Sequence, residues 1–211
     1  ANFLAEPSLE FPFVCLLVSG GHTQLWQIKD FMSYTLLGET RDDAAGEAFD
    51  KGARVLGLGY PGGPEIEIHA KSGNHKSINF PKALLKKNNF EFSFSGLKTS
   101  LLYYCEKNKE KKLADVAASY QYAIIDVLVK KLKHAADFTK SRNCVIAGGV
   151  AANQFLREHS KHQMPDKNII FPDLSFCTDN AAMIAYLGEK YFSIGKYSNL
   201  NFSILPNMKI I

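Results

Sequence analysis

The sequence predicts an α/β protein in which a mixed sheet is flanked by helices. Two short apolar runs, residues 12–18 and 143–147, each end in a glycine pair, which is typical of a buried strand entering a tight turn. Apolar residues also recur at helical spacing over residues 113–138. Because consecutive strands near the start give way to strands alternating with helices, the sheet should combine antiparallel and parallel pairs.

The first half of the chain should hold strands at residues 12–18, 23–28 and 34–37. A helix is expected to open at Asp42 and Asp43, since acidic residues favour the first turn, and to stop before the glycine-rich residues 57–63. Pro64 suits the first position of another helix, which should run to about residue 71. Residues 72–92 are expected to form a basic loop.

The second half should alternate between the two element types. We expect the long helix at 113–138, a strand at 143–147, a helix at 150–159 and a strand at 168–171. Thr178 or Asp179 should cap a final helix that extends to about residue 191. No repeat or linker interrupts this order, which predicts one compact lobe with a short tail.

Composition excludes several classes of protein. The chain has 211 residues, 46% of them hydrophobic and 22% charged, which is enough for a core and excludes disordered and collagen-like chains. No apolar run is long enough to span a membrane, and the start lacks the basic segment of a signal peptide. The four cysteines are far apart with no C-x-x-C pair, which favours a reducing, cytoplasmic location.

The two glycine pairs are the first candidate binding loops. Gly20–Gly21 lies between two strands beside Ser19, and such a loop can either cradle an anion with its N–H groups or form an ordinary hairpin turn. Gly148–Gly149 leads from a strand into a helix, whose N-terminus favours phosphate, with Asn153 as a further polar group. A plain turn with an exposed Asn is the alternative. Neither pair matches a Rossmann or P-loop pattern.

Other polar residues allow both a functional and a structural interpretation. Asp50 could face ribose hydroxyls, whereas Glu47 and Lys51 beside it are most simply a surface ion pair. Asp179 suits either a helix cap or a metal ligand. His159 and His162 most simply mark a solvated helix end. Residues 82–142 carry 13 Lys and Arg against 6 Asp and Glu, which fits a solvated face or phosphate contacts.

Together, six segments resemble the bacterial TsaD family, formerly called YgjD, Gcp or O-sialoglycoprotein endopeptidase. The resemblance covers about residues 11–195 and rests on segments 17–23 (LVSGGHT), 42–51 (DDAAGEAFDK), 60–64 (YPGGP), 92–99 (FSFSGLKT), 147–153 (AGGVAAN) and 177–180 (CTDN), in that order. It implies an actin-like fold, as in sugar kinases and Hsp70, with ribonuclease-H-like lobes around a nucleotide cleft. Family members transfer a threonylcarbamoyl group from threonylcarbamoyl-adenylate to the N6 amine of the adenosine beside the anticodon, in tRNAs reading ANN codons, and release AMP.

The resemblance also implies roles for particular residues. The loop holding the phosphate and acyl end of the adenylate would be formed by Leu17, Val18, Ser19, Gly20 and Gly21. The nucleoside would be bound by Asp50, Gly63, Glu67 and Asn153. Asp179 would hold one divalent metal, iron or zinc, and no residue would act as a covalent catalyst. The implied partners are tRNA, a TsaB-like paralogue and a TsaE-like ATPase, with no membrane.

The chain departs from the family in one respect. The family's other metal ligands are two histidines in an H-x-x-x-H pattern, which does not occur in these 211 residues. We therefore expect residues 1–12 to end a missing N-terminal lobe, 13–178 to form the C-terminal nucleotide-binding lobe, and 179–211 to pack back on the missing lobe. The chain alone should then be inactive.

Other functions remain possible from the residues. One is a non-catalytic nucleotide-binding component of a modification complex, and another is the older metalloprotease interpretation, which lacks paired histidines beside a carboxylate here. A sugar-kinase-like phosphotransferase is a further alternative, against which the segments 92–99 and 177–180 argue.

Overall fold

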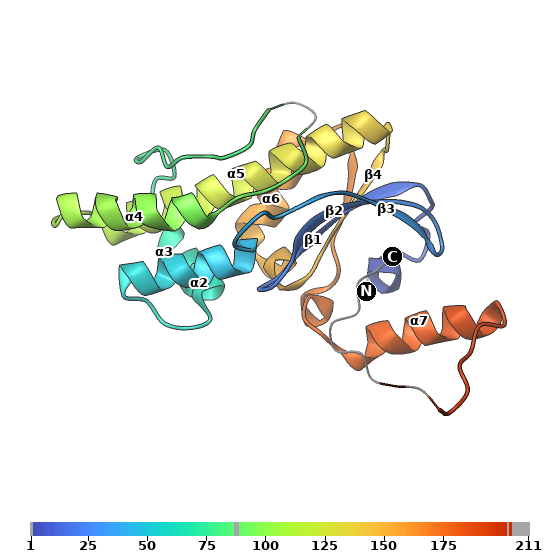
Figure 1. Ribbon diagram of the computed structural model, residues 1–211. Helices are drawn as coiled ribbons and strands as arrows, with labels where there is room; N and C mark the ends of the chain where they lie inside the picture. Colours follow the sequence, from blue (N-terminus) through green and yellow to red (C-terminus); the bar gives the residue numbers. More distant parts are fainter. Residues whose placement is uncertain (1, 87–88, 202, 204–211) are drawn as a thin grey trace. The chain divides into compact units, whose positions relative to one another are not determined.

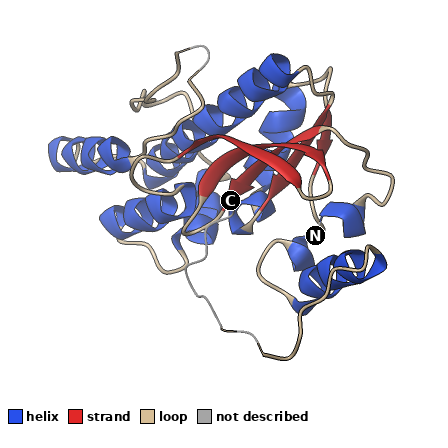
Figure 2. Ribbon diagram, turned by 45° about the vertical axis from the view of Figure 1, so that its right-hand side comes forward, coloured by secondary structure: helices blue, strands red, loops and turns tan. Residues whose placement is uncertain are grey.

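The computed structural model describes residues 2–86, 89–201 and 203, and it divides into two units (Figure 1). Unit 1 is Ala1–Thr178 and unit 2 is Asp179–Ile211. Unit 1 contains one twisted sheet, drawn in red in Figure 2, together with α1 to α6. Unit 2 contains α7 (Ala181–Ser193). No helix of the described part of the chain is long and apolar enough to cross a membrane.

The sheet is mixed, as the sequence predicts. Its strand order is β3 (Ser33–Glu39), β2 (Thr23–Asp30), β1 (Phe13–Val18), β4 (Asn143–Ala147) and β5 (Asn168–Ile170). The first three strands pair antiparallel, and β1, β4 and β5 pair parallel. Leu17 lies opposite Ala147, so β1 and β4 end at the same edge of the sheet. Both glycine pairs therefore leave the sheet side by side.

Most helices of unit 1 form around this edge and one face of the sheet, and the short α1 belongs to the cluster on the other face. Their bounds are α1 (Asn2–Ala5), α2 (Ala45–Leu56), α3 (Gly62–Ala70), α4 (Ser95–Lys107), α5 (Leu113–Thr139) and α6 (Gln154–Gln163), with short 3₁₀ helices at Gly149–Ala152 (η1) and Leu174–Phe176 (η2). Figure 1 shows α2, α3 and α4 at one end of unit 1 and the sheet at the other, with α5 extending along both.

The main core lies between the sheet and α5. Val14, Leu16 and Val18 alternate along β1 and are fully buried, because successive strand residues face opposite sides of the sheet. They join Ile124 and Leu128 of α5 in one apolar cluster. The other face of β1 belongs to a smaller cluster, against which residues of the segment before β1 pack. This second cluster gives residues 2–12 a place on the sheet of unit 1.

A tight contact joins α2 to α5. Tyr120 is fully buried, and its hydroxyl donates a hydrogen bond to the carbonyl oxygen of Ala48 at 2.8 Å. A Cβ atom at Gly52 would lie 2.2 Å from the Tyr120 ring, so only glycine allows this approach. Burial, and to a lesser extent the negative charge of Asp43, raises the pKa of Tyr120 above its ordinary value. The phenol therefore stays protonated and serves as a donor.

The start of α2 differs from the prediction. Asp42 and Asp43 do not begin this helix, because the first N–H groups of α2 are bound by another segment: Ala45 N donates to Thr23 Oγ1 at 2.8 Å and Gly46 N donates to Ser19 O at 3.1 Å. Asp42 instead accepts hydrogen bonds from the N–H groups of Phe94 and Ser95. It thereby caps α4, a helix that the sequence analysis did not predict.

Two further helix starts also differ. The helix expected from residue 150 is divided into η1 and α6, because the Asn153 side chain accepts from Leu156 N and caps α6 at that point. The last helix, α7, is capped by the Asn180 side chain, which accepts from Met183 N at 3.0 Å, and not by Thr178 or Asp179. Both helices thus begin after an Asn cap, and in α7 this Asn replaces the cap expected from the sequence pattern.

Candidate functional site

A cavity of about 470 Å³ opens where the glycine loop after β1 meets α2, α3 and η1. This volume falls in the range of roughly 300 to 1,000 Å³ that is usual for small-molecule sites. The position also suits a ligand, because ligands of open α/β sheets bind beyond the carboxyl ends of the strands. The lining residues are Gly20, Gly46, Phe49, Asp50, Tyr60, Pro61, Gly63, Pro64, Glu67, Gly149, Val150, Ala152, Asn153 and Thr178.

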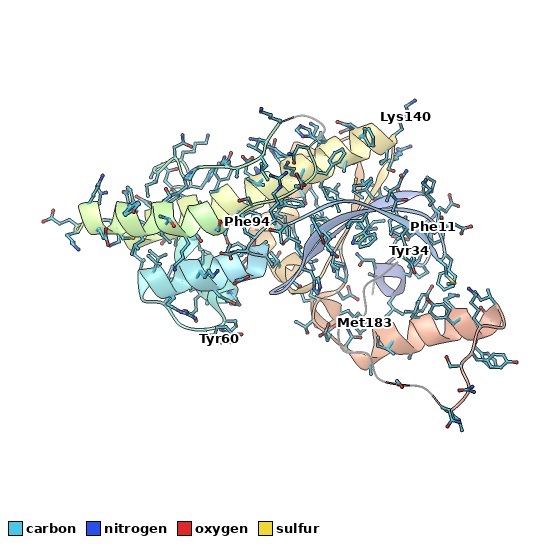
Figure 3. All side chains as sticks on the ribbon, viewed as in Figure 1. Phe11, Tyr34, Tyr60, Phe94, Lys140 and Met183 are labelled. Atoms are coloured by element: carbon cyan, nitrogen blue, oxygen red, sulfur yellow. The ribbon has the colours of Figure 1, made fainter. Side chains whose placement is uncertain are left out.

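Five of the residues predicted to bind substrate line this cavity: Gly20, Asp50, Gly63, Glu67 and Asn153. They come from segments that are far apart in the sequence, which the fold brings to one place. Tyr60, also in the lining, is 84% exposed at the outer edge of the loop between α2 and α3 (Figure 3). The lining therefore combines an exposed aromatic ring with the half-buried carboxylates of Asp50 and Glu67 and the buried amide of Asn153.

The other four predicted substrate residues do not line the cavity. Val18 is fully buried in the core, and Leu17 lies within β1 opposite Gln24. Ser19 Oγ accepts hydrogen bonds from the N–H groups of Gly21 and His22, at 3.3 and 3.0 Å. These contacts shape the glycine loop from within, so Ser19 holds the turn that presents Gly20.

Gly46 is a lining residue that the sequence analysis did not single out. A Cβ atom there would lie 2.7 Å from Ser19 O and 2.8 Å from Gly20 N. The start of α2 can therefore lie against the glycine loop only because residue 46 has no side chain. The signal in the sequence was its place within the segment 42–51, but its partner is 26 residues away and cannot be identified from local pattern.

Asp50 has one carboxylate oxygen occupied by the fold. Its Oδ1 accepts a hydrogen bond from Gly62 N, the first residue of α3, at 2.7 Å. Its Oδ2 has no hydrogen-bond partner among the described residues, and Asp50 lines the cavity. An acceptor oxygen at this position can receive a hydrogen bond from a sugar hydroxyl.

At the N-terminus of α6, two N–H groups are already bound by side chains, which favours the structural of the two interpretations of the second glycine pair. Glu67 Oε1 accepts from Gln154 N at 2.7 Å, and Asn153 Oδ1 accepts from Leu156 N at 2.9 Å. These two side chains satisfy N–H groups that would otherwise face an anion. Asn153 is 7% exposed, and its Nδ2 donates to Gln121 Oε1 at 2.9 Å.

Asp179 is the predicted metal ligand, and it is the first residue of unit 2. Within the described ranges, no group of three or more His, Cys, Asp or Glu side chains could hold a metal ion. Asp179 by itself offers one carboxylate, which leaves most of a coordination shell to other groups. The residues that the structure describes do not make up a metal site by themselves, and the metal role of Asp179 stays a prediction.

His159 is not part of a solvated helix end. Its side chain is 11% exposed, its ring stacks on Phe155 at 5.4 Å, and its Nε2 lies 3.5 Å from Asp126 Oδ1. Burial raises the pKa of Asp126, but contacts with His159, Lys130 and Lys82 outweigh burial and hold that pKa below its usual range. The buried carboxylate thus joins α5, α6 and the loop 72–92.

The basic middle of the chain is also only partly a solvated face. Lys131 is fully buried, and its ammonium group donates hydrogen bonds to the carbonyl oxygens of Leu84 and Asn89. Burial lowers the pKa of Lys131 to about 8. Lys130 pairs with Asp126 at 2.8 Å. Lys131 thus holds the loop 72–92 against α5, whereas the Lys130 pair lies within α5. The predicted ion pair between Glu47 and Lys51, at 3.0 Å, is confirmed.

Comparison with known proteins places this geometry in a family. Residues 1–186 match the family model described as "TsaD: tRNA N6-adenosine threonylcarbamoyltransferase". Proteins of that name from Kosmotoga olearia and Thermosipho melanesiensis are 51% and 50% identical to the chain over 213 and 212 residues. Each alignment covers 100% of this chain and 64% of the relative, so the chain spans slightly less than two thirds of the length of these relatives.

A solved structure shares the fold at much lower identity. The full-length HypF structure in its phosphate- and nucleotide-bound form has a TM-score of 0.74 and 11% identity, and the match covers 93% of this chain and 42% of HypF. This likeness supports the predicted actin-like α/β fold with its mixed sheet. The family model and the two relatives decide the family: the chain belongs to the TsaD family of tRNA N6-adenosine threonylcarbamoyltransferases.

Proposed function

We propose that the protein containing this chain transfers a threonylcarbamoyl group from threonylcarbamoyl-adenylate to the N6 amine of the adenosine beside the anticodon, in tRNAs reading ANN codons. The names of its relatives support tRNA modification. The observation that carries the proposal is the meeting of Gly20, Asp50, Gly63, Glu67 and Asn153 in one cavity of about 470 Å³. A cavity of this size suits a mononucleotide.

The proposed reaction needs no covalent enzyme intermediate. The amine nitrogen attacks the carbamoyl carbon, a new C–N bond forms, and the bond from that carbon to the phosphate oxygen breaks. AMP leaves with the electron pair of the broken bond, and the amine gives up one proton. Because the phosphate is already a good leaving group, the chain's main tasks are to position the adenylate and to stabilise charge on the departing phosphate.

The residues of the cavity suit these tasks. The open side of Gly20 has nothing within 4 Å of the position a Cβ would take, so a phosphate can approach the backbone of the loop closely. The unoccupied Oδ2 of Asp50 can accept from a ribose hydroxyl, and the Nδ2 of Asn153 can donate to a ring nitrogen or a sugar oxygen.

The remaining parts of the reaction are proposed from the family alone. Asp179 would contribute one ligand to a divalent metal, iron or zinc, whose other ligands lie outside the described residues. The partners would be tRNA, a TsaB-like paralogue and a TsaE-like ATPase that uses ATP. The target adenosine lies in a single-stranded loop, where a base can be splayed into a pocket at small cost.

Nucleotide binding by the chain tests the proposal directly. AMP, the proposed product, should bind to the chain, as measured by isothermal titration calorimetry. Asp50→Ala should lower the affinity for AMP about tenfold, because the contact with the sugar is lost. Glu189→Ala on the exposed surface of unit 2 is the matched control and should bind AMP as the unaltered chain does. Equal AMP affinity in Asp50→Ala and the unaltered chain would remove Asp50 from the site.

The whole protein allows a second test, of transfer itself. Asp179→Ala should abolish formation of threonylcarbamoyladenosine in tRNA, measured by mass spectrometry of digested tRNA, with little change in thermal unfolding. Normal transfer in that variant would contradict the metal assignment of Asp179. The nucleotide site of unit 1 is tested separately, by AMP binding.

A further inference from the structure

Gln121 lies in the middle of the long helix α5, next to the fully buried Tyr120, and is itself only 4% exposed. A buried amide is costly unless it is hydrogen-bonded, so a glutamine among the apolar residues of this helix needs a structural or functional reason. Its partner is Asn153, which lines the cavity proposed to hold the nucleotide. Gln121 does not line that cavity.

The orientation of both amides follows from the backbone. Leu156 N can only donate, so Asn153 must present Oδ1 to it, at 2.9 Å. The other end of the Asn153 amide, Nδ2, then faces Gln121, and because Nδ2 can only donate, Gln121 must present Oε1, also at 2.9 Å. A backbone N–H group of α6 thus determines which atom each of the two side chains presents, so the arrangement does not depend on a choice between amide flips.

This chain of contacts leaves one donor for a ligand. The Nδ2 group of Asn153 carries two hydrogens, of which Gln121 accepts one. The second has no acceptor among the described residues, at a side chain that lines the cavity. The cavity therefore offers an N–H donor at Asn153, which suits an acceptor such as a purine ring nitrogen or a sugar oxygen.

We propose that Gln121 is a positioning residue that holds the Asn153 amide so that it offers this N–H donor to the nucleotide. The inference rests on the proposed nucleotide function of the cavity. Gln121 acts through Asn153 and not by contact, because it does not line the nucleotide cavity but a neighbouring one of about 300 Å³, with Glu67 in the lining of both. Without the Gln121 acceptor, the Asn153 amide keeps only the contact of Oδ1 with Leu156 N, so Nδ2 loses the hydrogen bond that restricts its movement.

Two variants of Gln121 and one control separate this role from a merely structural one. Gln121→Met removes the acceptor and keeps similar length, whereas Gln121→Glu keeps an acceptor oxygen in either protonation state. Ser119→Ala is the matched control, because Ser119 is 1% exposed on the same helix and accepts from Ile78 N at 3.2 Å, away from Asn153. It should lower thermal stability without changing the site.

The readouts are the side-chain amide signals of Asn153 in a ¹⁵N–¹H NMR spectrum and the Kd of AMP by calorimetry. Gln121→Met should shift or broaden the Asn153 signals and raise the Kd of AMP by about three- to tenfold. Gln121→Glu should return AMP affinity to within about twofold of the unaltered chain, and Ser119→Ala should leave both readouts unchanged.

Two outcomes would overturn the inference. One is unchanged Asn153 signals in Gln121→Met, and the other is equal loss of AMP affinity in Gln121→Met and Gln121→Glu. Failure of the unaltered chain to bind AMP is a different result, because it would overturn the proposed nucleotide function itself. The Asn153 signals report the contact with Gln121 without any ligand, so the two failures can be told apart.

Discussion

The two glycine pairs look alike in the sequence but differ in the structure. A Cβ at Gly20 or Gly21 would meet nothing within 4 Å, and neither residue has a positive φ. At Gly148, φ is +95°, and a Cβ would lie 2.3 Å from Val18 O. In the second pair, Gly148 is therefore required by the packing of its loop against β1, whereas the fold itself allows a side chain at either residue of the first pair.

This difference distinguishes glycines that the fold requires from glycines that a ligand requires. Where a glycine has open space and an ordinary backbone, as at Gly20, a requirement for glycine can come only from something outside the described chain, such as a ligand that approaches the loop. Where a glycine faces backbone atoms, as at Gly148, the requirement comes from the fold.

Gly148→Ala should cause the largest loss. The added Cβ meets a backbone carbonyl oxygen and forces an alanine to a positive φ, so we expect a loss of roughly 2 to 4 kcal/mol in unfolding free energy. Chemical denaturation measures it. Gly149→Ala is the control, since it has open space and no positive φ, and a loss there equal to that of Gly148→Ala would contradict the steric argument.

Asn153→Ala should have an intermediate effect at the far end of the second loop. It removes the cap of α6 at Leu156 N, which costs about 1 kcal/mol, and it leaves Gln121 without its donor. AMP binding should also weaken about tenfold, in line with the loss of one hydrogen bond to the ligand. Calorimetry with AMP and denaturation together test this, and unchanged AMP affinity would remove Asn153 from the site.

Asp42 lies outside both glycine loops, and its contribution to stability should depend on pH. Partial burial raises the pKa of this carboxyl, but hydrogen bonds from Ser93, Phe94 and Ser95 outweigh burial and lower it to about 2. Because the pKa is lower in the folded state, the contribution to stability is present above the ordinary value of 3.8 and is lost as pH falls through about 2.

The expected size of the Asp42 contribution is about 1 kcal/mol, reduced by solvent screening because the side chain is exposed. Unfolding free energy should be followed from pH 7 down to about 2 in the unaltered chain and in Asp42→Asn. The difference between the two should disappear toward the acid end. A difference that stays constant over this range would show that the carboxylate charge does not stabilise α4.

Gly20→Ala should have the smallest effect on stability, within about 0.5 kcal/mol, because the added methyl group enters open space. The same methyl group projects at a residue that lines the cavity, so AMP should bind about tenfold more weakly. Thermal unfolding tests the expected stability, and calorimetry tests the expected loss of AMP affinity. Loss of stability similar to that of Gly148→Ala would remove the distinction between the loops.

Several features of the fold and site could be predicted from the sequence because they depend on local pattern. The apolar run at 12–18 and the helical spacing at 113–138 correspond to β1 (Phe13–Val18) and α5 (Leu113–Thr139). The end of α2 follows from Gly57, which adopts φ +72°. The resemblance of short segments to a family then identified Gly20, Asp50, Gly63, Glu67 and Asn153, which meet in the cavity.

Other features were decided only by the tertiary structure, because they depend on partners far away in the chain. Asp42 caps α4 across 52 positions, Asn153 is held by Gln121 across 32, and Lys131 is buried against a loop 42 to 47 positions away. Local pattern assigned these residues to a helix start, an exposed turn and a solvated face, since each role is common for its residue type. Sequence determined which elements form, because propensity and periodicity act over a few residues; the structure decided which polar groups are satisfied, because that depends on what packing brings within 3 Å.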